Sequence, residues 1–109
     1  MAKATYWQRG ESLDFKNTTN AKIEANTIIA LSGRIGVAGT DINPGEVGSV
    51  HVTGVYEIAK TGTAAIAQGA AVYWDGDGIT NVSTSNTLAG YAAADAAAAD
   101  TVILVKLQG

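Results

Sequence analysis

The stretch VGSVHVTGVYEIAK, residues 47–60, has the clearest strand pattern in the chain. Apolar residues recur at every second position and polar residues fill most positions between them, which is the period of a half-buried β-strand. The apolar positions are Val50, Val52, Tyr56 and Ile58. Gly54 interrupts the alternation, and a glycine inside a strand pattern indicates a bulge or a close approach of the backbone. The stretch therefore predicts a long strand that is irregular near its centre.

The rest of the chain shows the same period in shorter pieces. Further strands are predicted at residues 13–17, 23–31, 34–38, 71–74, 79–82 and 101–107. Asn43-Pro44-Gly45-Glu46 predicts a turn, because proline presets the first central position and glycine admits a positive φ at the next. About seven short strands separated by turns predict an all-β fold, a small single-domain barrel or sandwich.

One segment does not fit this pattern. Residues 92–99, AAADAAAA, have the highest intrinsic helix propensity in the chain. Eight residues are too few for a self-supporting helix in water, so we expect at most one short helix here, before the apolar strand TVILVKL.

Length, charge and cysteine content limit the possible functions. A chain of 109 residues is expected to form one domain. It has no cysteine, no apolar run of the roughly 20 residues that a membrane span needs, and no signal peptide, so we expect a soluble protein made in a cytoplasm. Its 7 basic residues are scattered and the net charge is −3, which argues against a nucleic-acid partner.

The stretch VYWDGDGIT, residues 72–80, allows two interpretations, a calcium loop or a hairpin turn. A calcium loop that starts at Asp75 needs a glycine at its sixth position and a glutamate at its twelfth, but Thr80 and Asn86 stand there. Asp-Gly between two strand patterns is instead a strong hairpin signal. We therefore predict a turn and no metal site.

The chain also contains a near match to a phosphate-binding loop. GVYEIAKT, residues 54–61, fits the pattern G-x-x-x-x-G-K-[ST] except that Ala59 replaces the second glycine. Such a loop leads into a helix, whereas these residues continue a strand, so Lys60 is interpreted as a surface residue at a strand end. The single histidine, His51, has no acid or nucleophile fixed beside it. We expect no catalytic residue, no cofactor and no enzymatic activity.

The N-terminal residues 1–12 form a predicted arm outside a β domain of residues 13–109. The arm carries aromatic and basic side chains without clear periodicity, and such side chains are enriched at interface hot spots. The candidate contact residues, with a partner or a sister subunit, are Tyr6, Trp7, Arg9 and Phe15. The alternative for Phe15 is a place in the core.

Three stretches carry a resemblance to a known family. They are GRIGVA at residues 33–38, G-x-V-H-V-x-G-V-Y-E at 48–57 and GAAVYWD at 69–75. With the flanking sequence from ATYWQRGESLDF to TVILVKL, the chain resembles the bacteriophage capsid cement, or head decoration, family. Members are often labelled recombinases of the RecA type, and the incomplete phosphate loop is a physical reason to distrust that label here.

The resemblance implies a structural protein on the outer surface of the virion, synthesised in the cytoplasm of a bacterial host. Its implied partners are the major capsid protein of an expanded phage head and its own copies, as a homotrimer. Two alternatives stay open. One is a carbohydrate- or host-surface-binding module with an exposed aromatic such as Tyr73 or Trp74, and the other is a nucleotide enzyme that uses Lys60.

Overall fold

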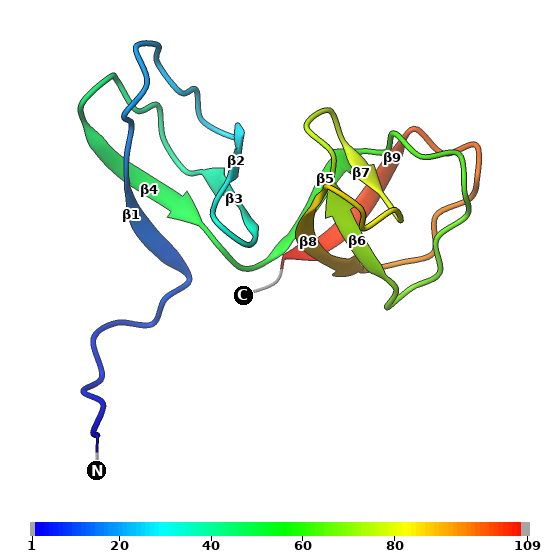
Figure 1. The fold of residues 1–109 in the computed structure, drawn as a ribbon, viewed down its shortest axis with the longest axis horizontal. Coiled ribbons are helices and arrows are strands. Elements are labelled where there is room, and N and C mark those ends of the chain that lie inside the picture. Colours follow the sequence, from blue (N-terminus) through cyan, green and yellow to red (C-terminus); the bar gives the residue numbers. More distant parts are fainter. Residues whose placement is uncertain (1, 108–109) are drawn as a thin grey trace.

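The computed structural model describes residues 2–107 and is all-β, as predicted (Figure 1). Met1, Gln108 and Gly109, at the ends of the predicted arm and domain, lie outside the described residues. The described part has nine strands and no helix. The strands are β1 (Ser12–Lys16), β2 (Ile28–Ala30), β3 (Ile35–Ala38), β4 (Val47–His51), β5 (Val55–Ala59), β6 (Ala71–Trp74), β7 (Ile79–Thr80), β8 (Thr87–Ala92) and β9 (Val102–Leu107).

These strands form two antiparallel sheets, and neither closes into a barrel. We call residues 12–52 the first lobe; its four-stranded sheet has the order β1-β4-β3-β2. We call residues 54–107 the second lobe; its five-stranded sheet has the order β5-β9-β8-β6-β7. The lobes lie side by side, and the N-terminal segment leaves the first lobe and extends away from both (Figure 1).

The predicted long strand over residues 47–60 is in fact two strands. β4 ends at His51 in the first lobe, and β5 begins at Val55 in the second. Gly54, with a φ of 113°, lies in the short link that carries the chain from one sheet to the other. The same alternation of buried and exposed residues continues on both sides of the link. Val50 before it and Ile58 after it are both buried, each in the core of its own lobe.

The helix expected near residues 92–99 is absent, and β8, which was not predicted, supplies the first residue of that run. Ala96 is buried and pairs through a β-bridge with Ile66. The Asp100 side chain accepts a hydrogen bond from the Ala97 N–H at 2.8 Å. This bond stabilises a non-helical turn at residues 97–100. Burial and side-chain hydrogen bonds outweigh a propensity of a few tenths of a kcal/mol per residue.

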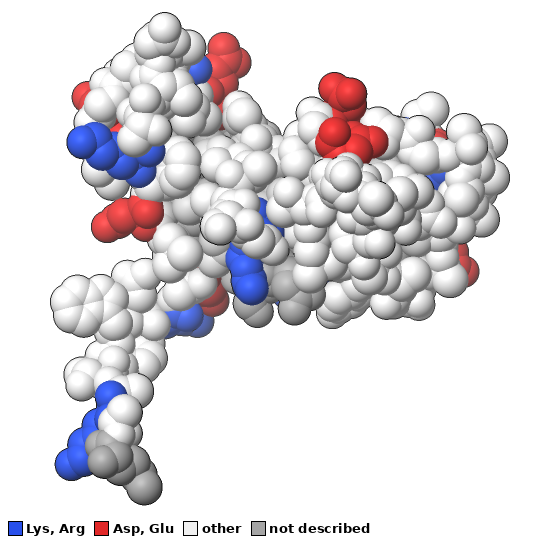
Figure 2. Space-filling view, viewed as in Figure 1, with Lys and Arg blue, Asp and Glu red and all other residues white. Residues whose placement is uncertain are grey.

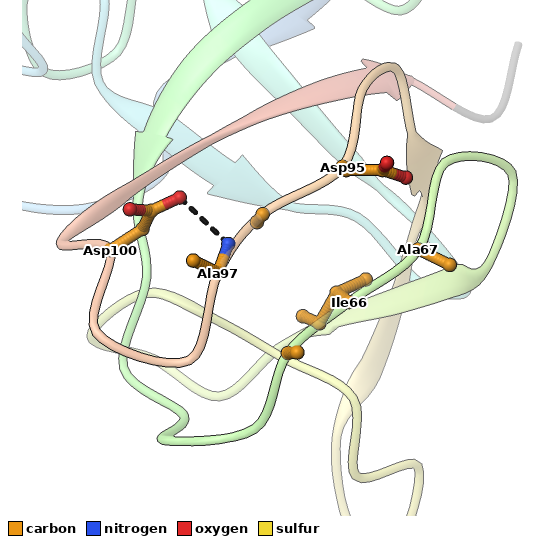
Figure 3. Close-up of a pocket in the computed structure, with 7 residues that line it drawn as sticks. Ile66, Ala67, Asp95, Ala97 and Asp100 are labelled. Carbon is orange, nitrogen blue, oxygen red and sulfur yellow. Dashed lines mark hydrogen bonds between the residues drawn. The ribbon is translucent and has the colours of Figure 1, made fainter.

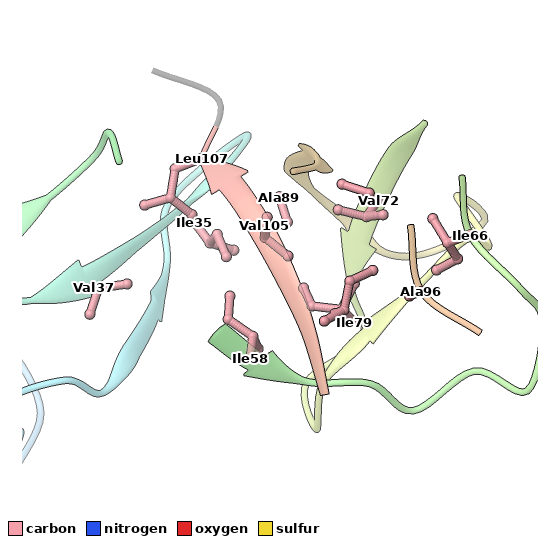
Figure 4. Close-up of a cluster of buried hydrophobic side chains, with 12 residues drawn as sticks. Ile35, Val37, Ile58, Ile66, Val72, Ile79, Ala89, Ala96, Val105 and Leu107 are labelled. Atoms are coloured by element: carbon pink, nitrogen blue, oxygen red, sulfur yellow. The ribbon is translucent and has the colours of Figure 1, made fainter. Parts of the chain in front are cut away.

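Each lobe has its own apolar cluster. The smaller cluster of the first lobe contains Ile29, Ala38, Val50 and Val52. The larger cluster fills the second lobe between β5, β6, β7 and β9 (Figure 4). Ile35 and Val37 of β3 belong to this second cluster, although they come from the first lobe. The contact between the lobes is therefore part of the main core.

The two lobes repeat one topology. Strands β5, β9, β8 and β6 follow the same spatial order as β1, β4, β3 and β2, and β7 is an addition at the edge of the second sheet. Each lobe also has one antiparallel bridge outside its strands, Ile23–Ile42 in the first and Ile66–Ala96 in the second. Asp41 Oδ1 accepts the Ala25 N–H at 2.8 Å, and in the second lobe an aspartate accepts the matching amide in the same way.

Candidate functional site

The N-terminal arm is the most exposed apolar segment that the structure describes. Residues 2–10 form no strand, and β1 begins at Ser12. The side chains of Tyr6 and Trp7 are 78% and 89% exposed. Two large aromatic side chains held in water can each bury about 150–250 Å² against a partner. The arm therefore offers contact area that the chain itself does not use.

Few interactions hold the arm to the first lobe. The Gln8 side chain donates a hydrogen bond to the Ser12 carbonyl at 3.4 Å, and Arg9 pairs with Glu11 at 3.4 Å. Both partners of that ion pair are largely exposed, and such pairs contribute at most about 1 kcal/mol. Gly10 has a φ of 77°, a conformation that favours glycine, where the arm bends into β1. Few interactions of the described residues therefore fix the direction of the arm.

Phe15 does not lie with the other three candidate residues. It is in β1, partly buried, and packs against the first-lobe cluster. Leu13, two residues earlier, lies on the same side of the strand, and its side chain remains 41% exposed. The structure thus gives Phe15 a packing contact at the rim of the core, and leaves Tyr6, Trp7 and Arg9 together on the arm.

The Asp75–Gly78 segment is a hairpin turn between β6 and β7, as predicted. Asp75 Oδ1 accepts the N–H groups of Asp77 at 2.8 Å and Gly78 at 2.9 Å, and Oδ2 accepts the Thr61 hydroxyl at 2.6 Å. These bonds, led by the one from Thr61, hold the pKa of Asp75 below its ordinary value. Residues 2–107 contain no group of three acidic, histidine or cysteine side chains arranged for a metal ion.

Lys60 is buried, so its interpretation as a surface residue was wrong. Its Nζ donates hydrogen bonds to the carbonyls of Gly62 at 2.7 Å and Ala98 at 3.2 Å. The corresponding position of the first lobe is Asn17, whose Nδ2 donates to Ile42 O at 2.9 Å. Both residues follow the first strand of their lobe and tie down a loop. Neither points at an open site.

A hollow of about 570 Å³ lies between the bridged loops of the second lobe (Figure 3). It is lined mainly by alanine side chains and Ile66. Its two carboxylates are already used, because Asp95 accepts the Gln68 N–H at 2.7 Å and Asp100 accepts the Ala97 N–H. The residues that line the hollow include no nucleophile, general base or other group positioned for catalysis.

Charge is dispersed over the surface. On the face in Figure 2, acidic and basic groups are scattered over both lobes and most of the surface is uncharged. Tyr73 and Trp74, the possible aromatic platform, are both half-buried, and Trp74 packs against the second-lobe cluster. No described segment is a helix with the length and apolar character needed to cross a bilayer.

One apolar surface was missed in the sequence. The side of the second-lobe sheet that faces away from the core exposes Val55, Tyr91, Val102 and Leu104. A signal was present, since residues 102–105 are apolar at every position, as in a strand covered on both faces. Like the arm, this surface is an exposed apolar region, and the described residues contain no catalytic constellation.

Comparisons with known proteins agree with a structural role. No curated protein and no solved structure matches the chain. A sequence model described as phage cement protein matches residues 7–107, which include Trp7, both lobes and the link between them. Because this match covers nearly the whole chain, the protein belongs to the phage cement protein family.

Proposed function

We propose that the protein binds the outer surface of an expanded phage head and stabilises the contacts between capsomers. Membership of the cement family supports a structural role on a phage capsid. The observation that carries the finer proposal is the arm, on which Tyr6 and Trp7 are exposed and held by few contacts. Its partner is the major capsid protein of the head, and the protein is synthesised in the host cytoplasm before it adds to the virion.

Many weak contacts are sufficient for this task. A homotrimer presents three arms, and after the first arm binds, the others bind at a high effective concentration without any single contact being strong. Genome pressure inside the head pulls capsomers apart, and a protein that bridges several of them raises the free energy needed to separate them. The proposal needs no cofactor and no chemical step.

In this proposal residues 1–12 are the contact arm and residues 13–109 the β domain. Trp7 is the central residue, since tryptophan, tyrosine and arginine dominate interface hot spots. Tyr6 and Arg9 flank it, whereas Phe15 acts through the packing of β1. Loss of a hot-spot side chain costs at least about 2 kcal/mol, or roughly 30-fold in affinity.

Variants of the arm test the proposal on expanded empty heads of the same phage. We expect Trp7→Ala to weaken binding by about 30-fold or more, and removal of residues 2–10 to abolish it, with an unchanged melting temperature in both cases. Val82→Ala, which removes an exposed apolar side chain elsewhere, is the matched control and should bind like the unmodified chain. Unchanged binding by the shortened chain would rule out the arm as the contact.

A further inference from the structure

The repeat of the two lobes allows one surface to be interpreted by comparison with another. Equivalent positions follow from the bridges. Ile28 stands five residues after Ile23, and Ala71 stands five after Ile66. In the same way Val37 precedes Ile42 by five residues, and Tyr91 precedes Ala96 by five. Tyr91 is therefore the second-lobe equivalent of Val37.

One backbone hydrogen bond at the corresponding end of each sheet agrees with this equivalence. In the first lobe the Val52 N–H donates to the Glu11 carbonyl at 3.1 Å, and in the second lobe the Leu107 N–H donates to Gly54 at 2.9 Å. Leu107 therefore corresponds to Val52. The second residues of β1 and β5, Leu13 and Tyr56, correspond in the same way.

The outer side of the first-lobe sheet is covered within the chain. Val37 and Ile35 point away from the first-lobe cluster, because the alternate residue Ala38 belongs to it. Instead they join the cluster of the second lobe, and Ile35 lies beside Val105 and Leu107 (Figure 4). One lobe thus buries the outer side of its sheet against the core of the next.

The corresponding side of the second-lobe sheet is uncovered. Tyr91, the equivalent of the buried Val37, is 43% exposed, and Ala71, the equivalent of Ile28, is also exposed. Leu104 and Val55 extend the same side across β9 and β5, where they pair with the charged residues Glu57 and Lys106. Large exposed apolar side chains that are bordered by polar ones are typical of an interaction surface.

The complementary surface on the first lobe is uncovered at its rim. Val50 and Val52, the equivalents of Val105 and Leu107, are buried within the lobe. Leu13, the equivalent of Tyr56, is 41% exposed, and Phe15 and Leu31 are only partly buried against the small first-lobe cluster. Each chain therefore has an uncovered outer sheet side on its second lobe and an uncovered core rim on its first lobe. The outer sheet side of the first lobe and the core of the second lobe are in contact and join the two lobes of the chain.

We propose that the outer side of the second-lobe sheet, centred on Tyr91, binds the rim of the first-lobe core at Leu13 and Phe15 in a second copy of the chain. The contact between copies repeats the contact between lobes, so the assembly is head-to-tail. A trimer built in this way is a closed ring of six lobes. This inference rests on the homotrimer of the proposed function and adds which surfaces form it. Its test uses no phage heads, so self-association and head binding can fail separately.

Charge substitutions on the two surfaces test this arrangement by sedimentation velocity. Tyr91→Lys and Leu13→Glu should each convert the oligomer to monomer, with self-association weakened by about 100-fold or more, since a charge is buried without a partner. Val82→Lys, at an exposed apolar position off both surfaces, should leave the oligomer intact. An equimolar mixture of the two monomeric variants should form a one-to-one dimer, because each keeps the surface that the other has lost.

The chain contains no cysteine, so single cysteines provide a second measurement for variants that fold poorly. Tyr91→Cys mixed with Leu13→Cys should give a disulfide-linked dimer under oxidation, and neither variant should do so efficiently by itself. The proposal is overturned if the unmodified chain is a monomer at about 1 mM, if both charge variants keep the oligomer, or if the mixtures form no heterodimer.

Discussion

A pair of core positions provides a quantitative test of the repeat. In the first lobe Ile42 is fully buried beside Gly48, where an added methyl group would overlap the Ile42 side chain. The second lobe fills the corresponding positions with Ala96 and Ile103. The first lobe thus has a large residue at the first position and glycine at the second, whereas the second lobe has alanine at the first position and a large residue at the second.

The structure predicts strong coupling between Ile42→Ala and Gly48→Val. The first change removes three buried carbons and should cost about 2–5 kcal/mol. The second adds three carbons where the space is occupied and should cost about 1–3 kcal/mol, without backbone strain because Gly48 has no positive φ. The double variant conserves volume and should lose less than about 1.5 kcal/mol. The two single changes together should cost about 3–8 kcal/mol, so the coupling energy is at least about 1.5 kcal/mol in favour of the double variant.

Urea unfolding followed by the fluorescence of the half-buried Trp74 measures these energies. A single transition is expected because the second-lobe cluster includes residues of the first lobe. The double variant should recover about 0.5–3.5 kcal/mol relative to Ile42→Ala, or roughly 2–14 °C in melting temperature, taking about 4 °C per kcal/mol for a chain of this length. A double variant less stable than either single one would refute the equivalence of the two pairs.

Three further substitutions test the hydrogen bonds that hold the loops. Asn17→Ala should lower the unfolding free energy by about 2–4 kcal/mol because it removes the buried bonds of that side chain, whereas the exposed Asn20→Ala should change it by less than about 0.5 kcal/mol. Lys60→Met should cost about 1–3 kcal/mol by leaving two carbonyls without their donor, and Lys16→Met, at an exposed position, should be neutral; equal denaturation midpoints for the two lysine variants would contradict this. The pKa of Asp75 is lowered on folding, so the stabilising contribution of its carboxylate is present above about pH 4 and is lost as the pH falls through the folded pKa. The unfolding free energy of Asp75→Asn should therefore fall less than that of the unmodified chain between about pH 6 and pH 2. Urea titrations at several pH values measure this difference.

Much of the strand content could be predicted from alternation, and the Asp75–Gly78 turn could be predicted from its residues. The break at Gly54 could not, because the inward positions continue across it with the same period although β4 and β5 belong to different sheets. The buried Lys60 was missed because its partners are backbone carbonyls, including one 38 residues away, and these leave no trace in a local pattern.

The repeat of the lobes was hidden for a physical reason. Equivalent positions conserve their role and not their residue type, as Asn17 and Lys60 show at the end of the first strand of each lobe. The hairpin with β7 also lengthens the second lobe and shifts the numbering. Residues 2–10 form no strand, which agrees with their lack of periodicity, but their role as a contact arm and its binding partner remain proposals.

Co-sedimentation of the unmodified protein with empty heads tests the proposed function most directly. Expanded and unexpanded heads of the same phage are incubated with increasing protein, and bound protein is measured in the pellet. The proposal predicts saturable binding to expanded heads alone, and heads that resist heat better once they are decorated. Folded protein that binds neither form, or that binds both equally, would contradict it.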